Sequence, residues 1–296
     1  MSIIKYIYRT LIPESIRWKV IHAKKKTQEN SIKAKVLKYY NEYPTHDSEI
    51  NEALKYLKNN DLSVFPYVFF NSYKNKNIRV FKDESNQLPY VNHLNKKLYF
   101  KKSWTNEHII DAYRFLLAEQ DLQSAHCYLT SNYKIKENGI VVDVGAAEGI
   151  FAINEIENIK HLYLIETDQE WIEALKETFK PWNDKITIIN KFISNKNDNS
   201  NMTLDSFFSN RDIDFLKIDV DGAEEELLNG ADFVVTNKVK QLAICTYHKT
   251  NDNLDFSKLL VSKEYKIENS KGYMLFYFDS NFEQPFFRRG LIRAVK

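Results

Sequence analysis

The chain has 296 residues, enough for one large domain or for a domain with an accessory region, and its 43% hydrophobic and 28% charged residues are typical of a soluble globular protein. Its two cysteines, Cys127 and Cys245, are too few for a disulfide framework or a cysteine-based metal knuckle, which suits a reducing cytoplasm. No apolar run approaches the roughly 18 residues that span a bilayer, and charged residues interrupt the early apolar segment, so neither a membrane span nor a signal peptide is expected.

The net charge of +2 conceals a strongly basic start. Residues 1–38 hold ten Lys or Arg and two Glu, so the rest of the chain is net acidic. The first 26 residues mix basic residues with apolar and aromatic ones. Such a helix either lies on an anionic membrane surface or packs on its own domain or a partner subunit. Nucleic acid is not an expected partner, because the positive charge is confined to one end without an aromatic-basic platform.

The first third of the chain has a mixed pattern. Residues 1–60 are largely helical in pattern. The segments 63–70 and 78–83 are predicted strands on either side of a polar loop at 71–77. Apolar residues at helical spacing predict a helix from Ile109 to Leu117.

From residue 139 onward, short apolar strands alternate with helices. The predicted strands are 139–145, 161–168, 185–194, 213–220 and 241–248, and the helices are 149–158, 169–179, 203–208, 223–231 and 254–264. Because βαβ units produce this alternation, it predicts an α/β fold with a doubly wound, Rossmann-like parallel sheet. Two further strands at 264–270 and 273–280, joined by Lys271-Gly272, predict a C-terminal antiparallel hairpin. We expect residues 1–105 to form an accessory region and residues 106–296 the doubly wound domain.

The turn from the first strand of the sheet to its first helix, VVDVGAAEGIF, contains Gly145 and Gly149. Glycines there allow a tight turn and let a ligand approach the backbone, but the GxxxG spacing differs from the GxGxxG of a pyrophosphate cradle. Asp143 would repel a pyrophosphate and attract a cationic cofactor such as S-adenosylmethionine, which carries an ammonium and a sulfonium. Ala147 and Glu148 lie in the same loop and are further candidate cofactor contacts.

Glu166 ends the second strand of the sheet. An acid at this place can accept hydrogen bonds from the ribose of either NAD or S-adenosylmethionine, so Glu166 alone does not distinguish the two cofactors. It lies at the C-terminal edge of the strand beside that of Asp143, and α/β sheets bind ligands at this edge.

An acid cluster, DVDGAEEE, follows the fourth strand. Asp219 closes an apolar strand that neighbours the first strand in a doubly wound sheet, so it is expected to face the reactive end of the cofactor. Asp221 is either the cap of the next helix or, with Asp219, a ligand of a divalent metal. Glu224 and Glu225 stand in the first turn of that helix, where acids favour the helix dipole.

His248 ends the fifth strand and is expected beside Asp219. Methyl transfer to a hydroxyl requires the hydroxyl to lose its proton, and a histidine suits the role of general base. A metal held by Asp219 and Asp221 is the alternative means of acidifying the hydroxyl, and a surface histidine on a loop is the alternative without a function. His126 has a weaker case for contacting cofactor or substrate.

These stretches together resemble the FkbM family of S-adenosylmethionine-dependent O-methyltransferases. The resemblance rests on VVDVGAAEGIFAI, LIETD, TLDSF and FLKIDVDGAEEELLNGA in that order, with similar stretches at EQDLQSAHCYL and ICTYHK, and it covers roughly residues 110–290. The family usually has Glu where this chain has Asp221. The resemblance implies a class I methyltransferase fold, S-adenosylmethionine as the cofactor, and a sugar or surface-glycan hydroxyl as the acceptor.

Two other functions remain as alternatives. A glycosyltransferase would use Asp219 and Asp221 as a DxD motif for a metal and a nucleotide sugar, but it leaves Asp143, Gly145 and Glu166 without roles. A non-catalytic protein would bind the cofactor and act as the scaffold of a membrane-bound glycan-assembly complex.

Overall fold

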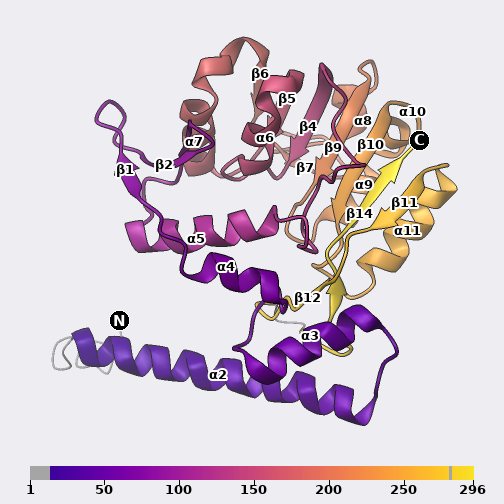
Figure 1. Ribbon diagram of the computed structural model, residues 1–296. Helices are drawn as coiled ribbons and strands as arrows, with labels where there is room; N and C mark the ends of the chain where they lie inside the picture. The colour runs from indigo at the N-terminus through magenta and orange to yellow at the C-terminus, as the bar shows by residue number, and fades with distance from the viewer. Residues whose placement is uncertain (1–13, 280–281) are drawn as a thin grey trace. The chain divides into compact units, whose positions relative to one another are not determined.

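A computed structural model describes residues 14–279 and 282–296 (Figure 1). The chain divides into two compact units, each described here by itself. The first comprises residues 1–67 and 275–287, and the second comprises residues 68–274 and 288–296. The expected division into an accessory region at residues 1–105 and a domain at residues 106–296 stays a prediction.

The described residues of the first unit form the helices α2 (Glu14–Glu42) and α3 (Ser48–Asn59), as the helical pattern of this region predicts. Asp47 caps α3 by accepting hydrogen bonds from the backbone amides of its first turn. Residues 1–13 of the predicted amphipathic segment 1–26 lie outside the described residues, and residues 14–26 form the first part of α2. No helix of the described part of the chain is long and apolar enough to cross a membrane.

The second unit is built on a seven-stranded sheet in the order β11-β14-β10-β9-β4-β5-β6 (Figure 1). The strands are β4 (Gly139–Val144), β5 (Ile159–Ile165), β6 (Ile186–Ile189), β9 (Ile213–Ile218), β10 (Val239–Cys245), β11 (Lys266–Asn269) and β14 (Leu291–Val295). Strands β6, β5, β4, β9 and β10 are parallel to one another, and β14 runs antiparallel to both of its neighbours, β10 and β11. This order confirms the predicted doubly wound, Rossmann-like sheet.

The antiparallel C-terminal strands are confirmed, but the predicted pairing of their segments is wrong. Strand β11 pairs with β14, and only a short β12 (Tyr273–Met274) forms in the segment predicted to be its partner, where it pairs with β13 (Arg288–Arg289). The reason is burial: β14 lies between two strands and its residues 291–294 are buried. The apolar segment that follows β12 belongs instead to the first unit, where Leu275 donates a backbone hydrogen bond to Val64.

A second correction concerns the segments 63–70 and 71–77. The first forms no strand: it ends in a 3-10 turn at Val68–Phe70, and the second begins with a helical turn, α4 (Asn71–Lys74). Pro66 lies within the first segment and cannot donate a ladder hydrogen bond, which disfavours a strand there. The strand predicted at 78–83 is confirmed as β1 (Val80–Lys82), which pairs with β2 (Pro89–His93), and β2 pairs with β3 (Lys96–Tyr99).

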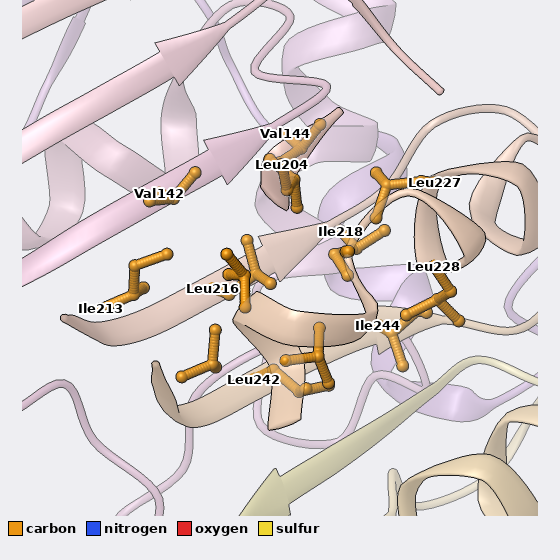
Figure 2. Close-up of a cluster of buried hydrophobic side chains, with 14 of the residues drawn as sticks. Val142, Val144, Leu204, Ile213, Leu216, Ile218, Leu227, Leu228, Leu242 and Ile244 are labelled. Atoms are coloured by element: carbon orange, nitrogen blue, oxygen red, sulfur yellow. The ribbon is translucent and has the colours of Figure 1, made fainter. Parts of the chain in front are cut away.

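Among the described residues, one α-helix directly precedes the large sheet in the chain, and six more lie between its strands. They are α5 (Asn106–Glu119), α6 (Ile150–Glu155), α7 (Gln169–Thr178), α8 (Leu204–Phe208), α9 (Glu224–Asn229), α10 (Asp232–Asn237) and α11 (Asp252–Ser262). Figure 2 shows the core on one face of the sheet, where side chains of β4, β9 and β10 meet Leu204 of α8 and Leu227 and Leu228 of α9. Burial of these apolar side chains fixes the strand ends that carry the candidate site.

Candidate functional site

The glycine loop between β4 and α6 has a strained backbone. Gly145 and Gly149 have φ angles of +76° and +82°, and Ala147 between them also has a positive φ of 46°. A Cβ on Gly145 would lie 1.8 Å from the carbonyl oxygen of Asp219. Gly145 is therefore required for close packing of β4 against the end of β9. Ala147 carries strain of the kind that gathers at functional sites.

A cavity of about 430 Å³ opens beside this loop at the C-terminal edge of the sheet. Its volume lies within the range of small-molecule sites. Its lining residues come from the ends of β4, β5 and β9 and from neighbouring loops: Lys101, Val144, Gly145, Ala147, Ile165, Glu166, Thr167, Asp168, Trp171, Lys191, Phe192, Ile193, Asp219, Val220 and Asp221. Strand order reverses between β4 and β9, so the cavity lies where α/β sheets bind cofactors.

Glu166 lines the cavity and has a fixed carboxylate. One of its oxygens accepts a hydrogen bond from the backbone amide of Ala147 at 2.9 Å, and the other accepts from the amides of Thr167 and Asp168 at 2.6 and 2.9 Å. These bonds tie the glycine loop to the end of β5. A carboxylate has about four acceptor positions, so Glu166 retains one for a ligand hydroxyl.

Asp143 does not line the cavity. Its carboxylate is buried and lies 2.8 Å from the ammonium of Lys217, which also donates to the carbonyl oxygen of Gly145 at 2.8 Å. Burial by itself lowers the pKa of Lys217, but the carboxylates of Asp143 and Asp219 outweigh it and raise that pKa above its ordinary value. The charge predicted to attract the cofactor is therefore paired inside the protein, and direct cofactor contact by Asp143 stays a prediction.

Glu148 is also absent from the lining of this cavity. It is buried at the start of α6, and one of its oxygens accepts from the backbone amide of Ile150 at 3.3 Å. Burial raises the pKa of Glu148 to about 7. Its predicted contact with the cofactor stays a prediction.

Asp219 lines the cavity, and its carboxylate is surrounded by hydrogen-bond donors. Tyr128 donates to Oδ2 at 2.7 Å and Tyr247 donates to Oδ1 at 3.2 Å. The Nε2 atom of His126 lies 3.4 Å from Oδ2, and that of His248 lies 4.0 Å from Oδ1. The structure thus brings Asp219 and His248 together, as their neighbouring strands predict, and adds His126 and two tyrosines.

His248 is enclosed by carboxylates. Its Nδ1 lies 2.8 Å from Oε1 of Glu224, and its Nε2 lies 3.6 Å from Oδ1 of Asp221. Burial by itself lowers the pKa of His248, but Asp221, Glu224 and Asp219 outweigh it and raise that pKa to about 10. The imidazole is therefore a cation at neutral pH in the free protein. The imidazole accepts a proton only in its neutral form, which a rise in pH or a nearby positive charge favours.

The acid cluster after β9 has roles that differ from those predicted. Helix α9 begins after Ala223 without a side-chain cap, so Asp221 does not cap it. Glu224 does stand in the first turn, but its side chain is buried, accepts from the backbone amide of Val220 at 3.1 Å and meets His248. It therefore orients the histidine as well as favouring the helix dipole.

The predicted metal pair does not fit this geometry. Two groups of side chains among the described residues could place three ligand atoms together: His126, Asp219 and Cys245, and Asp219, Glu224 and His248. Neither includes Asp221, whose side chain is exposed. Both oxygens of Asp219 accept tyrosine hydrogen bonds.

Four features of the site were not predicted from the sequence: the contacts of Tyr128, Tyr247 and Lys217, and the burial of Glu224. Tyr247 directly precedes His248, and Tyr128 lies within the AHCYL stretch. The clearest signal is Lys217, which interrupts an apolar strand. A lysine in a buried strand requires a buried partner, and Asp143 in the neighbouring strand is in register with it.

Comparison with known proteins identifies part of the chain. Residues 180–273 match the family described as Methyltransferase FkbM domain, which confirms the resemblance found in the sequence. No curated protein matches the chain.

Many solved structures are similar to the chain, and three of them are given as examples. A methyltransferase FkbM from Methylobacillus flagellatus KT is 19% identical, with a TM-score of 0.45, over 64% of this chain and 52% of that one, so this chain spans about half of its length. TrmK from M. capricolum, solved with S-adenosyl-homocysteine, is 16% identical, with a TM-score of 0.39, over 57% and 69%. A putative transferase, PH0793 from Pyrococcus horikoshii, is 13% identical, with a TM-score of 0.44, over 72% and 73%.

Proposed function

We propose, from the premise that residues 180–273 match the FkbM methyltransferase domain, that this protein is an S-adenosylmethionine-dependent O-methyltransferase. We propose further that its acceptor is a hydroxyl of a sugar or of a surface-glycan precursor. The methyltransferase part rests on the domain match. The sugar acceptor rests on the resemblance in sequence to the FkbM family.

The observation that carries the proposal is the charge of the cavity at the C-terminal edge of the sheet. Its lining includes four carboxylates, Glu166, Asp168, Asp219 and Asp221, and two lysines. One of the lysines, Lys101, is paired with Asp168 at 2.6 Å. A dinucleotide would bring its pyrophosphate into a net acidic site, whereas the sulfonium and ammonium of S-adenosylmethionine suit it.

In this proposal, different residues bind the cofactor and accept the proton. Glu166 would accept a hydrogen bond from the ribose, and Trp171 with Ile165 would supply apolar contacts for the adenine. When bound, S-adenosylmethionine supplies an electrophilic methyl group. Asp219 and His248 would flank the acceptor hydroxyl, and His248 would take its proton once a nearby cation has lowered the pKa of the imidazole.

A labelled-methyl assay tests the proposal. Purified protein is incubated with methyl-labelled S-adenosylmethionine and glycan precursors from the producing cell, and the product is treated with alkali and then hydrolysed to monosaccharides. The proposal expects the label to survive alkali and to appear in a methylated sugar, because an ether resists alkali and an ester does not. Label in protein, lipid or an alkali-labile ester would contradict the acceptor class.

Replacing Glu166 by alanine is expected to weaken S-adenosylhomocysteine binding at least about tenfold, since a charge-assisted hydrogen bond to the ribose and the tie to Ala147 are both lost. Titration calorimetry measures the affinity. Asp198→Ala is a matched control, because Asp198 also accepts from two backbone amides, at 2.8 Å each, in a loop outside the cavity. Unchanged affinity in Glu166→Ala would place the ribose elsewhere.

The basic start of the chain supports peripheral membrane contact as a further part of the proposal. Deleting residues 1–26 is expected to release the protein from anionic vesicles while leaving methyl transfer to a soluble acceptor intact. Co-sedimentation with anionic and neutral vesicles measures the effect, and the neutral vesicles are the control. Equal binding to anionic vesicles before and after deletion would reject membrane contact, and loss of folding would favour the packing of this helix on protein.

A further inference from the structure

Two buried tyrosines stand behind the carboxylate of Asp219. Tyr128 precedes β4 and Tyr247 follows β10, and each donates to a different oxygen of Asp219, at 2.7 and 3.2 Å. The tyrosines are 2% and 7% exposed, whereas 17% of the Asp219 side chain is exposed and lines the cavity. The phenols therefore contact the carboxylate from the protein side and leave its other face toward the cavity.

The shifted pKa values of these groups favour protonated tyrosines and an ionised Asp219. Burial raises the pKa of Tyr128 and that of Tyr247 well above their ordinary value, so both phenols remain donors. Burial by itself raises the pKa of Asp219, but His126, Lys217 and His248 outweigh it and hold that pKa well below the ordinary range. Asp219 is therefore an anion throughout the working range of pH.

The carboxylate of Asp219 also lies near two histidines. His126 lies 3.4 Å from one oxygen of Asp219, and His248 lies 4.0 Å from the other. Each oxygen of Asp219 therefore has one phenol and one imidazole beside it, and the phenol is the closer of the two. Two charge-assisted hydrogen bonds hold a carboxylate more firmly than either imidazole alone.

Asp219 and Glu166 mark opposite ends of the cavity. Strand β4 lies between β5, which carries Glu166, and β9, which carries Asp219. If Glu166 holds the ribose, as the proposed function requires, Asp219 faces the part of the cofactor that carries the sulfonium and the ammonium.

We propose that Tyr128 and Tyr247 are positioning residues that orient the Asp219 carboxylate toward the cationic methionine end of S-adenosylmethionine. This inference rests on the proposed function. It assigns the two tyrosines to recognition of the cofactor's charge rather than to structure alone.

The test compares a charged ligand with an uncharged one. Dissociation constants of S-adenosylmethionine and of 5′-methylthioadenosine are measured by calorimetry for wild type, Tyr128→Phe, Tyr247→Phe and the double variant. 5′-Methylthioadenosine keeps the adenosine and the thioether and lacks the sulfonium and the amino-acid part. The double variant is expected to bind S-adenosylmethionine about tenfold more weakly and to bind 5′-methylthioadenosine within about twofold of wild type.

Matched controls are Tyr133→Phe and Tyr265→Phe. Both tyrosines are buried in the same unit, and their phenols donate to backbone carbonyls rather than to Asp219. These variants are expected to leave the ratio of the two dissociation constants unchanged. In an Asp219→Asn background the ratio is already reduced, and adding Tyr128→Phe is expected to change it no further.

Each outcome decides the matter. Equal weakening of both ligands would show that the tyrosines only support the cavity, and no weakening of either would show that Asp219 needs no orientation; both results overturn the inference. If the double variant does not fold, the single variants and the Asp219→Asn background give the same comparison. If wild type fails to bind S-adenosylmethionine, the proposed function fails and the inference with it.

Discussion

Replacing Lys217 by methionine is expected to lower the free energy of unfolding by about 3–5 kcal/mol, because it leaves the Asp143 carboxylate buried without its cation. Lys217 and Asp143 have side chains that are 5% and 1% exposed, with 2.8 Å between their charged atoms. Lys217 also holds the carbonyl of Gly145, so the glycine loop loses a second contact. Urea unfolding followed by tryptophan fluorescence measures the change.

A matched control for this prediction is Lys240→Met. Lys240 forms a pair with Asp214 at the same distance, 2.8 Å, but its side chain is 56% exposed, so its loss is expected to cost less than about 1 kcal/mol. Replacing both members of the buried pair, as Asp143→Leu with Lys217→Met, is expected to recover at least half of the lost stability. A small effect of Lys217→Met alone would mean that the buried carboxylate is protonated rather than paired.

Replacing His248 by alanine is expected to lower turnover about a hundredfold while leaving S-adenosylmethionine affinity near that of wild type, because general-base help is worth about this factor. The pH dependence has a definite sign. A histidine takes a proton only when unprotonated, and the pKa of His248 is raised to about 10 in the free protein. The kcat/KM of wild type is therefore expected to rise with pH toward 10, and that of the variant is expected to lose this rise.

His161→Gln is the control for this substitution. His161 lies in β5, where its Nε2 is 2.9 Å from the hydroxyl of Thr187, away from the cavity lining. Its replacement is expected to leave the pH profile unchanged.

Activity is also expected to be indifferent to a chelator, since Asp219 and Asp221 do not fit a metal. If His248→Ala keeps most of its rate, proximity and orientation of the hydroxyl account for catalysis.

The sequence predicts the sheet and one edge of the site because both depend on local pattern. Alternating apolar strands and helices identify βαβ units, and the doubly wound order places Asp219 near the glycine loop and His248 near Asp219. Both neighbour relations hold in the structure. Family resemblance then supplied the cofactor class, which the strand pattern alone leaves open.

The parts that the sequence did not predict depend on pairing across long stretches of chain. Strand β14 inserts between β10 and β11, and nothing in the local pattern of 264–280 indicates that insertion. The two tyrosines that donate to Asp219 are 119 residues apart in the chain, one before β4 and one after it. The high pKa of His248 arises from three carboxylates that gather only on folding.

The central claim is that the cavity beside the glycine loop binds S-adenosylmethionine. One calorimetric series tests it most directly, with S-adenosylmethionine, S-adenosylhomocysteine, NAD and a nucleotide sugar, the last with and without a divalent metal. The account predicts saturable binding of the two S-adenosyl ligands and none of NAD or the nucleotide sugar. Metal-dependent binding of the nucleotide sugar without binding of S-adenosylmethionine would contradict it and would favour a glycosyltransferase.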